Sequence, residues 1–384
     1  MKIIYNIAGL FNAGGMERVL TNKANYLAGL GYEVIILTTD QKNRKPYFDL
    51  KSCVKHLDLG INYAEIQDLG LFFKAVAYWN KQRLHERRMR TLLNELEADV
   101  VICMFDHDVS FLHKIEDGSK KVLEIHFSRF KRLQYGRKGL WRVVDRQRSD
   151  RDLRLAKKYD RFVVLTKEDK GYWGDLNNIV VIPNANSFLT DTTAELSNKV
   201  AIAVGRYDYQ KGFDDLIKIW AMVQPGFPDW QLKIYGAGEM ETEMRKMIED
   251  LNLEQYVFLC EPVRNIKEAY LSSSVYLMTS RYEGLPMALL EAQSCGLPLL
   301  SYACKCGPRD IIEEGRNGYL VKQDDMEEFV RRLREMLSRE GLRKAMGEQG
   351  KDMSQHFSEE VVMKQWIKLF EEVLNESMDV TAKR

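Results

Sequence analysis

Cysteine, proline and long apolar runs are all scarce in this sequence of 384 residues. The six cysteines are scattered through a large chain, which argues against the disulfide framework of small secreted domains. No stretch reaches the roughly 18 consecutive apolar residues that a membrane-spanning helix needs. Residues 1–15 lack a basic leader and a small-residue cleavage site, so they predict a strand and not a signal peptide. We therefore expect a cytoplasmic protein.

An overall excess of charge is lacking too, because the formal net charge is only +1. The halves differ, however: residues 1–187 carry 32 Lys and Arg against 23 Asp and Glu, and residues 188–384 carry 25 against 33. The surplus gathers at Arg129, Lys131, Arg132, Arg137, Lys138, Arg142, Arg146, Arg148, Arg151, Arg154, Lys157 and Lys158. This segment is either a solvated helix face or a surface for an anionic partner, such as membrane phospholipid or a lipid pyrophosphate. Nucleic acid is not expected, because no stacking aromatics or reader motif accompany it.

Aromatic side chains concentrate in residues 69–79, just before the basic stretch 81–90. Either a partly buried helix or a helix that docks on an acceptor or a membrane would have this composition. The sequence leaves both interpretations open.

The length predicts two domains of similar size, each with its own core. Short apolar runs alternate with amphipathic segments, which indicates an α/β protein with two doubly wound parallel sheets. The strands expected in the first half are Lys2–Ile7, Glu33–Thr38, Val100–Met104, Lys121–Ile125, Arg161–Leu165 and Val180–Ile182. Those expected in the second half are Val200–Val204, Gln231–Tyr235, Val257–Leu259, Val275–Met278, Leu297–Ser301 and Gly318–Val321. We place the domains at 1–187 and 188–361, with a polar linker at 187–198 and a last helix, about 362–384, that returns to the first domain.

Two cations follow the first strand of the second half. Arg206 and Lys211 lie in the loop 205–212, just before a helix that starts near Phe213. Ligands bind at the carboxyl edge of open α/β sheets, where this loop is expected. A leaving nucleoside diphosphate is an anion, so cations at this edge suit the departure of such a group.

The segment 280–292 combines a turn, a helix start and two carboxylates. Gly284 and Pro286 mark the turn, and Met287–Ser294 predicts the helix. The N–H groups at a helix start attract an anion such as a diphosphate. Glu283 before the helix and Glu291 within it are suited to accept hydrogen bonds from sugar and ribose hydroxyls.

Glu283 and Glu291, with seven residues between them, resemble the E-x7-E signature of the retaining glycosyltransferases of family 4 in the GT-B superfamily. The resemblance extends over nearly the whole chain, through Gly14-Gly15-x-Glu17, Val181-Ile182-Pro183-Asn184, Gly205-Arg206 with Lys211-Gly212, Tyr235-Gly236-Ala237-Gly238 and residues 315–321. It implies the GT-B fold, in which two Rossmann-like domains face each other across a cleft. Two departures are Ala185, where relatives often have glycine, and the irregular run Cys304–Pro308.

The resemblance also implies roles for single residues. Arg206 and Lys211 would bind the donor diphosphate, Glu283 the transferred sugar and Glu291 the ribose. His126, after the strand that ends at Ile125, matches the active-site histidine near the sugar. The further donor contacts that we expect are Gly14, Gly15, Met16, Gly236, Gly284, Leu285, Pro286 and Met287, with the glycines allowing close backbone approach.

Other motifs are weaker. Gly236-Ala237-Gly238 lacks the third glycine of a dinucleotide fingerprint. Asp106-His107-Asp108 resembles the metal-binding D-x-D of a different glycosyltransferase fold, and we expect it to face the acceptor or to be a polar loop. The pair Cys304-x-Cys306 has no partner pair for zinc. We therefore expect neither a metal nor a bound cofactor.

The sequence thus predicts a metal-independent, retaining transfer of a hexose or N-acetylhexosamine from a nucleotide sugar, with UDP as the expected carrier. A glycan or lipid-linked acceptor in cell-surface polysaccharide assembly is expected, with possible contact to an anionic membrane at its inner face. Same-face attack is favoured over a covalent intermediate. Two alternatives remain: a nucleotide-sugar epimerase of the same architecture and a non-catalytic sugar-nucleotide binding protein.

Overall fold

The computed structural model describes residues 1–12, 14–131, 140–263 and 265–381. The chain forms two compact units. Unit 1 contains residues 1–165, 170–182 and 363–384, and unit 2 contains residues 166–169 and 183–362. The sequence predicts the domain change at 187/188, and in the structure the chain contributes residues 166–169 to unit 2 and returns to that unit at Pro183.

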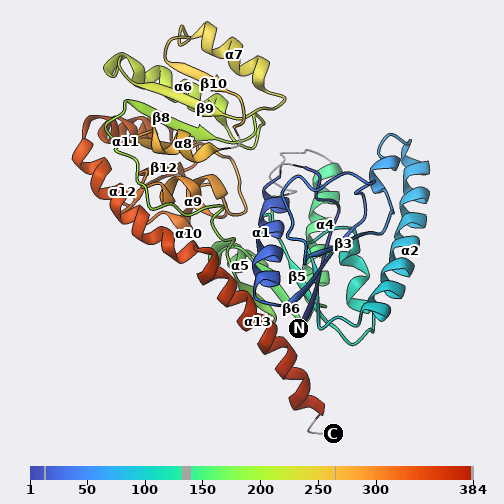
Figure 1. Cartoon of the computed structure of the whole chain (residues 1–384). Coiled ribbons are helices and arrows are strands. Elements are labelled where there is room, and N and C mark those ends of the chain that lie inside the picture. Colours follow the sequence, from blue (N-terminus) through green and yellow to red (C-terminus); the bar gives the residue numbers. More distant parts are fainter. Residues whose placement is uncertain (13, 132–139, 264, 382–384) are drawn as a thin grey trace. The chain divides into compact units, whose positions relative to one another are not determined.

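A seven-stranded parallel sheet forms the centre of unit 1, in the order β3-β2-β1-β4-β5-β6-β7 (Figure 1). Its strands are β1 (Lys2–Ile7), β2 (Glu33–Thr38), β3 (Lys55–Asp58), β4 (Val100–Cys103), β5 (Lys120–Glu124), β6 (Arg161–Val164) and β7 (Ile179–Val181). The helices of this part are α1 (Gly15–Gly29), η1 (Tyr63–Ile66), α2 (Leu71–Leu96), η2 (His107–Ser110), η3 (Leu112–Lys114), α4 (Leu140–Ala156) and α5 (Lys167–Trp173). The central strands are apolar on both faces because helices cover a doubly wound sheet on both sides.

Unit 2 contains a six-stranded parallel sheet in the order β10-β9-β8-β11-β12-β13. Its strands are β8 (Val200–Val204), β9 (Gln231–Tyr235), β10 (Val257–Cys260), β11 (Val275–Met278), β12 (Leu299–Tyr302) and β13 (Gly318–Val321). Its helices are α6 (Phe213–Val223), η4 (Gln224–Gly226), α7 (Glu241–Asp250), α8 (Ile266–Leu271), α9 (Met287–Ser294), α10 (Pro308–Ile311), α11 (Met326–Ser338), α12 (Glu340–Ser354) and η5 (Gln355–Phe357). Two doubly wound sheets are therefore present, as the alternating pattern predicts.

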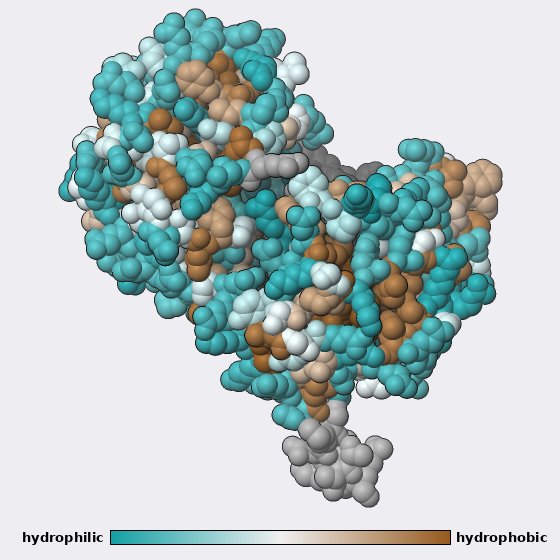
Figure 2. Space-filling view, in the orientation of Figure 1, coloured by the Kyte–Doolittle hydropathy of each residue, from teal (hydrophilic) through white to brown (hydrophobic). Residues whose placement is uncertain are grey.

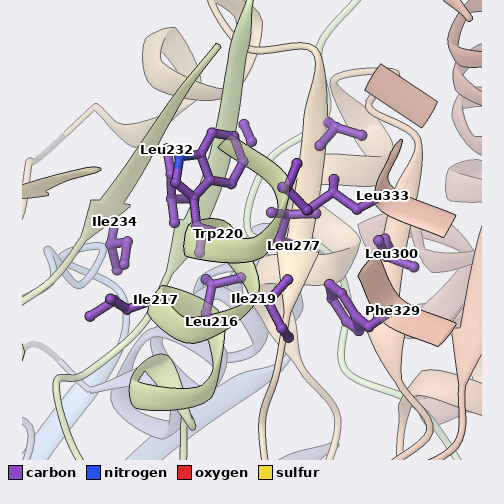
Figure 3. Packing of buried hydrophobic residues seen from close by; sticks show 14 of the residues in the cluster. Leu216, Ile217, Ile219, Trp220, Leu232, Ile234, Leu277, Leu300, Phe329 and Leu333 are labelled. Carbon is purple, nitrogen blue, oxygen red and sulfur yellow. The ribbon is translucent and has the colours of Figure 1, made fainter. Parts of the chain in front are cut away.

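Helices α6 and α11 cover one face of the unit 2 sheet (Figure 3). Trp220 of α6 lies among the strand residues Leu232 and Leu277, and Phe329 of α11 packs near Leu300. All five side chains are fully buried. This core fixes the strands whose carboxyl ends carry the loops described below.

The polar stretch 187–198 is not a free linker. Arg343 donates to the carbonyl oxygen of Leu196 at 2.9 Å, and Lys351 donates to the carbonyl oxygen of Thr190. The backbone N–H of Ala194 also donates to Cys295 at 2.9 Å. A composition rich in Thr, Asn and Ser suggested a linker, but these backbone hydrogen bonds hold the segment against unit 2.

The last helix, α13 (Glu359–Thr381), starts in unit 2 and continues in unit 1 from Met363 onward. Its buried side chains include Met363, Trp366 and Phe370. Within the residues that the structure describes, no helix has the length and apolar character needed to cross a membrane.

Candidate functional site

The loops after β8 and β11 meet at the carboxyl edge of the unit 2 sheet, because these two strands are neighbours. The Nζ of Lys211 lies 2.7 Å from Oε1 of Glu283, and the two side chains are 18% and 7% exposed. Gln210 supports this pair, since its Nε2 donates to the carbonyl oxygen of Tyr282 at 3.0 Å and lies 3.5 Å from Oε2 of Glu283. A cation and a carboxylate are thus held side by side at the edge where α/β sheets bind ligands.

Close backbone packing brings the two loops together. Gly212 has a φ of 63°, and a Cβ at this position would lie 2.3 Å from the carbonyl oxygen of Thr279. The hydroxyl of Thr279 donates to the carbonyl oxygen of Gly212 at 2.8 Å. Arg281 adds a bidentate ion pair to Asp214, at 2.7 and 3.0 Å. The glycine is therefore required for the approach that places Lys211 beside Glu283.

Arg206 lies apart from this pair. Its side chain is 72% exposed and forms an ion pair with Asp208 at 3.0 Å. It also donates to Oε1 of Gln210 at 3.3 Å, so Gln210 connects Arg206 with Glu283. The predicted diphosphate cations thus belong to one loop, but only Lys211 contacts the carboxylate.

Glu291 occupies α9, which begins at Met287 as the sequence predicts. It is 7% exposed and accepts a hydrogen bond from the hydroxyl of Tyr270 at 3.0 Å. Burial raises the pKa of Tyr276, and the negative charges of Glu283 and Glu291 raise it further. The charges of both carboxylates therefore raise the pKa of the same phenol on β11. No described hydrogen bond joins Glu283 to Glu291.

The start of α9 is formed by the predicted residues 284–287. Leu285 and Pro286 are buried, whereas Gly284 and Met287 are half-buried. Pro286 precedes the helix and supplies no side-chain cap, and the N–H of Leu289 donates to the carbonyl oxygen of Pro286 at 3.0 Å, so an anion at this helix start would meet the N–H groups of Met287 and Ala288. At Gly236, a Cβ would lie 1.8 Å from the carbonyl oxygen of Gly205, which explains this glycine by packing between the β8 and β9 loops.

In unit 1, His126 follows β5 and its side chain is 8% exposed. Its Nε2 lies 3.0 Å from Oε1 of Glu124, although this buried nitrogen makes no well-aligned hydrogen bond among the described residues. Gly14 precedes α1, and Gly15 and Met16 are its first residues. A Cβ at Gly15 would meet no atom within 4 Å, so the space beside it is open.

The motif of Asp106, His107 and Asp108 is a structured loop. Asp106 accepts a hydrogen bond from the N–H of His107 at 2.8 Å, and the His107 ring stacks on Tyr63 with centroids 3.7 Å apart. Asp108 is fully buried beside the Sγ of Cys103, at 3.1 Å. Among the described residues, no three His, Cys, Asp or Glu side chains are grouped so as to hold a metal ion.

Sequence comparison identifies the family of the chain. Residues 13–185 match the family described as Glycosyltransferase Family 4, and residues 189–353 match Glycosyl transferases group 1. The amylovoran biosynthesis glycosyltransferase AmsD of Erwinia amylovora is 37% identical over 388 residues, covering 95% of this chain and 98% of AmsD. An uncharacterized glycosyltransferase of Haemophilus influenzae is 30% identical over 371 residues, with coverage of 95% and 98%. This chain is a glycosyltransferase of the group 1, family 4 kind.

Solved structures show the fold of this glycosyltransferase. The apo form of WaaB, a lipopolysaccharide outer core galactosyltransferase, matches with a TM-score of 0.72 at 22% identity, covering 97% of this chain and all of WaaB. TarM of Staphylococcus aureus, in complex with UDP, matches with a TM-score of 0.76 at 17% identity and coverage of 96% and 99%. The two parallel-sheet units are therefore the two halves of a GT-B fold.

Several residues of the glycosyltransferase site were missed from sequence. Gln210 and Tyr270 are ordinary polar residues without a motif of their own, and only the fold shows that they contact Glu283 and Glu291. Lys23 did leave a signal, because it occupies the same helical face as Val19 and Leu27, which predicts a core position. A lysine at such a position requires a buried partner.

Proposed function

We propose that this glycosyltransferase moves a hexose or N-acetylhexosamine from a UDP-sugar to a glycan or lipid-linked acceptor, with retention of configuration and without a metal ion. The 2.7 Å contact between Lys211 and Glu283 carries this proposal. Sugar and diphosphate share one glycosidic oxygen, so the groups that bind them must be neighbours. A cation for the phosphate and an acceptor for a sugar hydroxyl have that arrangement here.

In this proposal each residue acts on the bond that breaks. Lys211, Arg206 and the first turn of α9 stabilise the negative charge on the departing diphosphate. Glu283 accepts a hydrogen bond from the transferred sugar, and Glu291 accepts one from the ribose. The acceptor hydroxyl attacks from the face that the diphosphate leaves, and its proton passes to the leaving phosphate oxygen.

Relatives and neighbours support the donor and acceptor classes. AmsD is named for amylovoran biosynthesis, and a Campylobacter jejuni relative, 25% identical over 381 residues, is named as an N-acetylgalactosaminyltransferase acting on an undecaprenol diphosphate glycan. The structures of TarM and of Anabaena HepE each contain UDP. We extend these properties to the present chain as cell-surface polysaccharide assembly from a UDP-sugar.

Contact with an anionic membrane forms part of the proposal. Leu71, Phe72 and Phe73 open α2 and are 84%, 75% and 69% exposed. Figure 2 shows hydrophobic surface gathered at the α2 end of unit 1. Burial raises the pKa of Tyr78 on α2, while the cations Arg151 and Arg148 of α4 oppose the rise, which places α4 arginines near this helix. Exposed aromatic side chains next to arginines suit an anionic lipid surface.

A donor panel tests the activity. The protein is incubated with UDP- and GDP-sugars, with and without glycan or undecaprenol-linked acceptors, and nucleoside diphosphate release is followed together with the anomeric configuration of the product by NMR. Acceptor-dependent UDP release with a retained anomer, unaffected by EDTA, is expected. An epimerase would change the sugar without releasing UDP, and a binding protein would shift the thermal melting temperature without turnover.

A further inference from the structure

A buried ion pair lies at the carboxyl end of β5 in unit 1. The ammonium group of Lys23, from the middle of α1, lies 2.6 and 2.7 Å from the two carboxylate oxygens of Glu124. The side chains are 4% and 0% exposed. Lys23 Nζ also lies 3.8 Å from the ring centre of Trp366 on α13, which covers the pair together with Tyr5.

Such a pair is a poor means of stabilising a core. Removing two charges from water costs several kcal/mol per ion, and apolar side chains of similar size often fold as well or better. A buried pair next to a functional group is better explained by what it does to that group. Here the neighbouring group is His126.

Strand geometry places His126 against the pair. Residues 124 and 126 are two apart at the end of a strand, where alternate side chains share a face. The Nε2 of His126 lies 3.0 Å from Oε1 of Glu124, the same oxygen that lies 2.6 Å from Lys23. Burial opposes the charge of Glu124, but Lys23 and His126 outweigh it and bring its pKa to about 2. The carboxylate therefore stays ionised, and it lies between the Lys23 ammonium group and the His126 ring.

We propose that Lys23 and Glu124 are positioning residues that hold the His126 imidazole and set its charge state during sugar transfer. Glu124 orients the ring and favours its protonated form, whereas Lys23 neutralises much of the carboxylate and keeps the imidazole able to become neutral. This inference rests on the proposed function, together with the role near the transferred sugar that the family resemblance implies for His126.

The groups that face this cluster come from four elements. Lys23 belongs to α1, Glu124 to β5 and Tyr5 to β1, while Trp366 of α13 contributes an aromatic face without a titratable group. Burial and the charge of Glu124 both raise the pKa of Tyr5, which keeps its phenol neutral. Among the described contacts, Glu124 is the charged group at 3.0 Å from the His126 ring, and Lys23 is the charged group at 2.6 Å from the same oxygen.

The two partners should shift the titration of His126 in opposite directions. The chain has only six histidines, so the His126 resonance can be assigned by its loss in His126→Gln and followed by NMR between pH 5 and 9. Loss of the neighbouring negative charge in Glu124→Gln should move the midpoint of this titration downward, and loss of the neighbouring positive charge in Lys23→Met should move it upward. The pH profile of kcat should move in the same directions, and kcat should fall on the order of 10²-fold at neutral pH as the ring loses its position.

Matched variants separate positioning from folding. Lys121→Met breaks another buried ion pair of β5, that with Asp117, and should lower the melting temperature without changing the His126 titration. Lys23→Met/Glu124→Gln leaves the buried site neutral, so it should fold even if Lys23→Met does not, and its His126 titration should lie between those of the two single variants. UDP binding, which we assign to unit 2, and the donor KM should stay within about twofold of wild type, because these changes affect orientation and not uniform binding.

The results distinguish this inference from the proposed function. If Glu124→Gln and Lys23→Met fold but leave both kcat and the His126 titration unchanged, the positioning role is overturned. In that case the activity of the wild type still supports the proposed transferase function. If Lys121→Met shows the same loss of kcat and the same change in the His126 titration, the pair of Lys23 and Glu124 has only a structural role. A wild type that transfers no sugar, or a fully active His126→Gln, would instead remove the proposed role of His126 itself.

Discussion

At the scale of single side chains, the proposed sugar transfer depends most on the contact between Lys211 and Glu283. If Lys211 stabilises the departing diphosphate, Lys211→Met should lower kcat on the order of 10²-fold or more, by analogy with the loss of one transition-state donor in other enzymes. The same variant should still fold, because Lys211 is at a loop surface and 18% exposed.

A matched lysine provides the control for this experiment. Lys199 precedes β8 at the opposite edge of the sheet and forms an exposed ion pair with Asp229 at 2.7 Å. Lys199→Met should change kcat by less than twofold, because Lys199 lies at the edge of the sheet opposite the site. The loss of its exposed ion pair should also cost only roughly 0–1 kcal/mol of stability. Equal rates for the two variants would remove the assigned role of Lys211.

Asp108 should make the stability of the protein depend on pH. Burial raises its pKa from 3.8 to about 7, although hydrogen bonds from neighbouring groups oppose the rise. Because the folded state holds this proton more tightly than the unfolded state, the favourable contribution is complete below about pH 4 and is lost as the pH rises through 7. The predicted loss is at most about 4 kcal/mol.

Asp108→Asn isolates this effect. Its free energy of unfolding in urea, measured at pH 5, 6, 7 and 8, should decline less than that of wild type and exceed it at pH 8. The amide keeps an oxygen to accept from the Sγ of Cys103. Parallel pH curves for the two proteins would show that Asp108 is already ionised in the fold.

At the scale of elements, the fold does not explain why apolar side chains are exposed at the start of α2. Phe72→Ser/Phe73→Ser should reduce binding to vesicles of anionic phospholipid at least tenfold, because each exposed aromatic ring loses its apolar contact with the lipid. Cosedimentation measures the bound fraction, and 0.5 M salt should weaken wild-type binding as well.

Leu30 offers a matched control in the same unit. It ends α1, is 55% exposed and lies outside the basic and aromatic elements, so Leu30→Ser should bind vesicles as wild type does. If the wild-type protein does not bind anionic vesicles at low salt, the exposed side chains of α2 bind another partner or none.

The strands that sequence predicts well are those with buried apolar runs. β1, β2, β8, β11 and β13 have the predicted limits, because most of their side chains face helices and must be apolar. β9 also has its predicted limits, although only Leu232 and Ile234 are buried in it. β3 was missed because Lys55, His56 and Asp58 give it no apolar run, and its mostly exposed residues pair only with β2. An edge strand of this kind is specified by its neighbour and not by its own composition.

The candidate site, like the strands, can be predicted only in part from the sequence. The motif around Glu283 and Glu291 predicts a shared site, but the Lys211 contact and the supports from Gln210 and Tyr270 depend on strand order. Neither strand order nor side-chain distance is encoded locally. The basic residues Arg132, Arg137 and Lys138 lie outside the residues that the structure describes, so their part in an anionic surface remains a prediction.

At the scale of the whole molecule, the last helix completes unit 1. Trp366 of α13 is 1% exposed and covers Lys23 in unit 1. Trp366→Ala should destabilise unit 1 by roughly 3–5 kcal/mol, as truncations of large buried side chains do. Hydrogen exchange should show reduced protection in β1 and β5 and little change in β8 and β11.

Val361, on the same helix and 40% exposed, supplies the comparison. Val361→Ala should leave both exchange patterns unchanged, because surface truncations usually alter stability by less than about 0.5 kcal/mol. Uniform loss of protection across both units in Trp366→Ala would mean that they unfold as a single cooperative body.

The return of α13 also has a consequence for how the protein is made. The ribosome synthesises most of unit 1 first, then residues 183–362 of unit 2, and only afterwards the part of α13 that belongs to unit 1. At about 5–20 residues per second this interval lasts on the order of ten seconds or longer. During that interval Lys23 lacks Trp366, the aromatic side chain that covers it in the folded protein. Premature termination before Trp366 should therefore yield a product that chaperones and proteases recognise as incompletely folded.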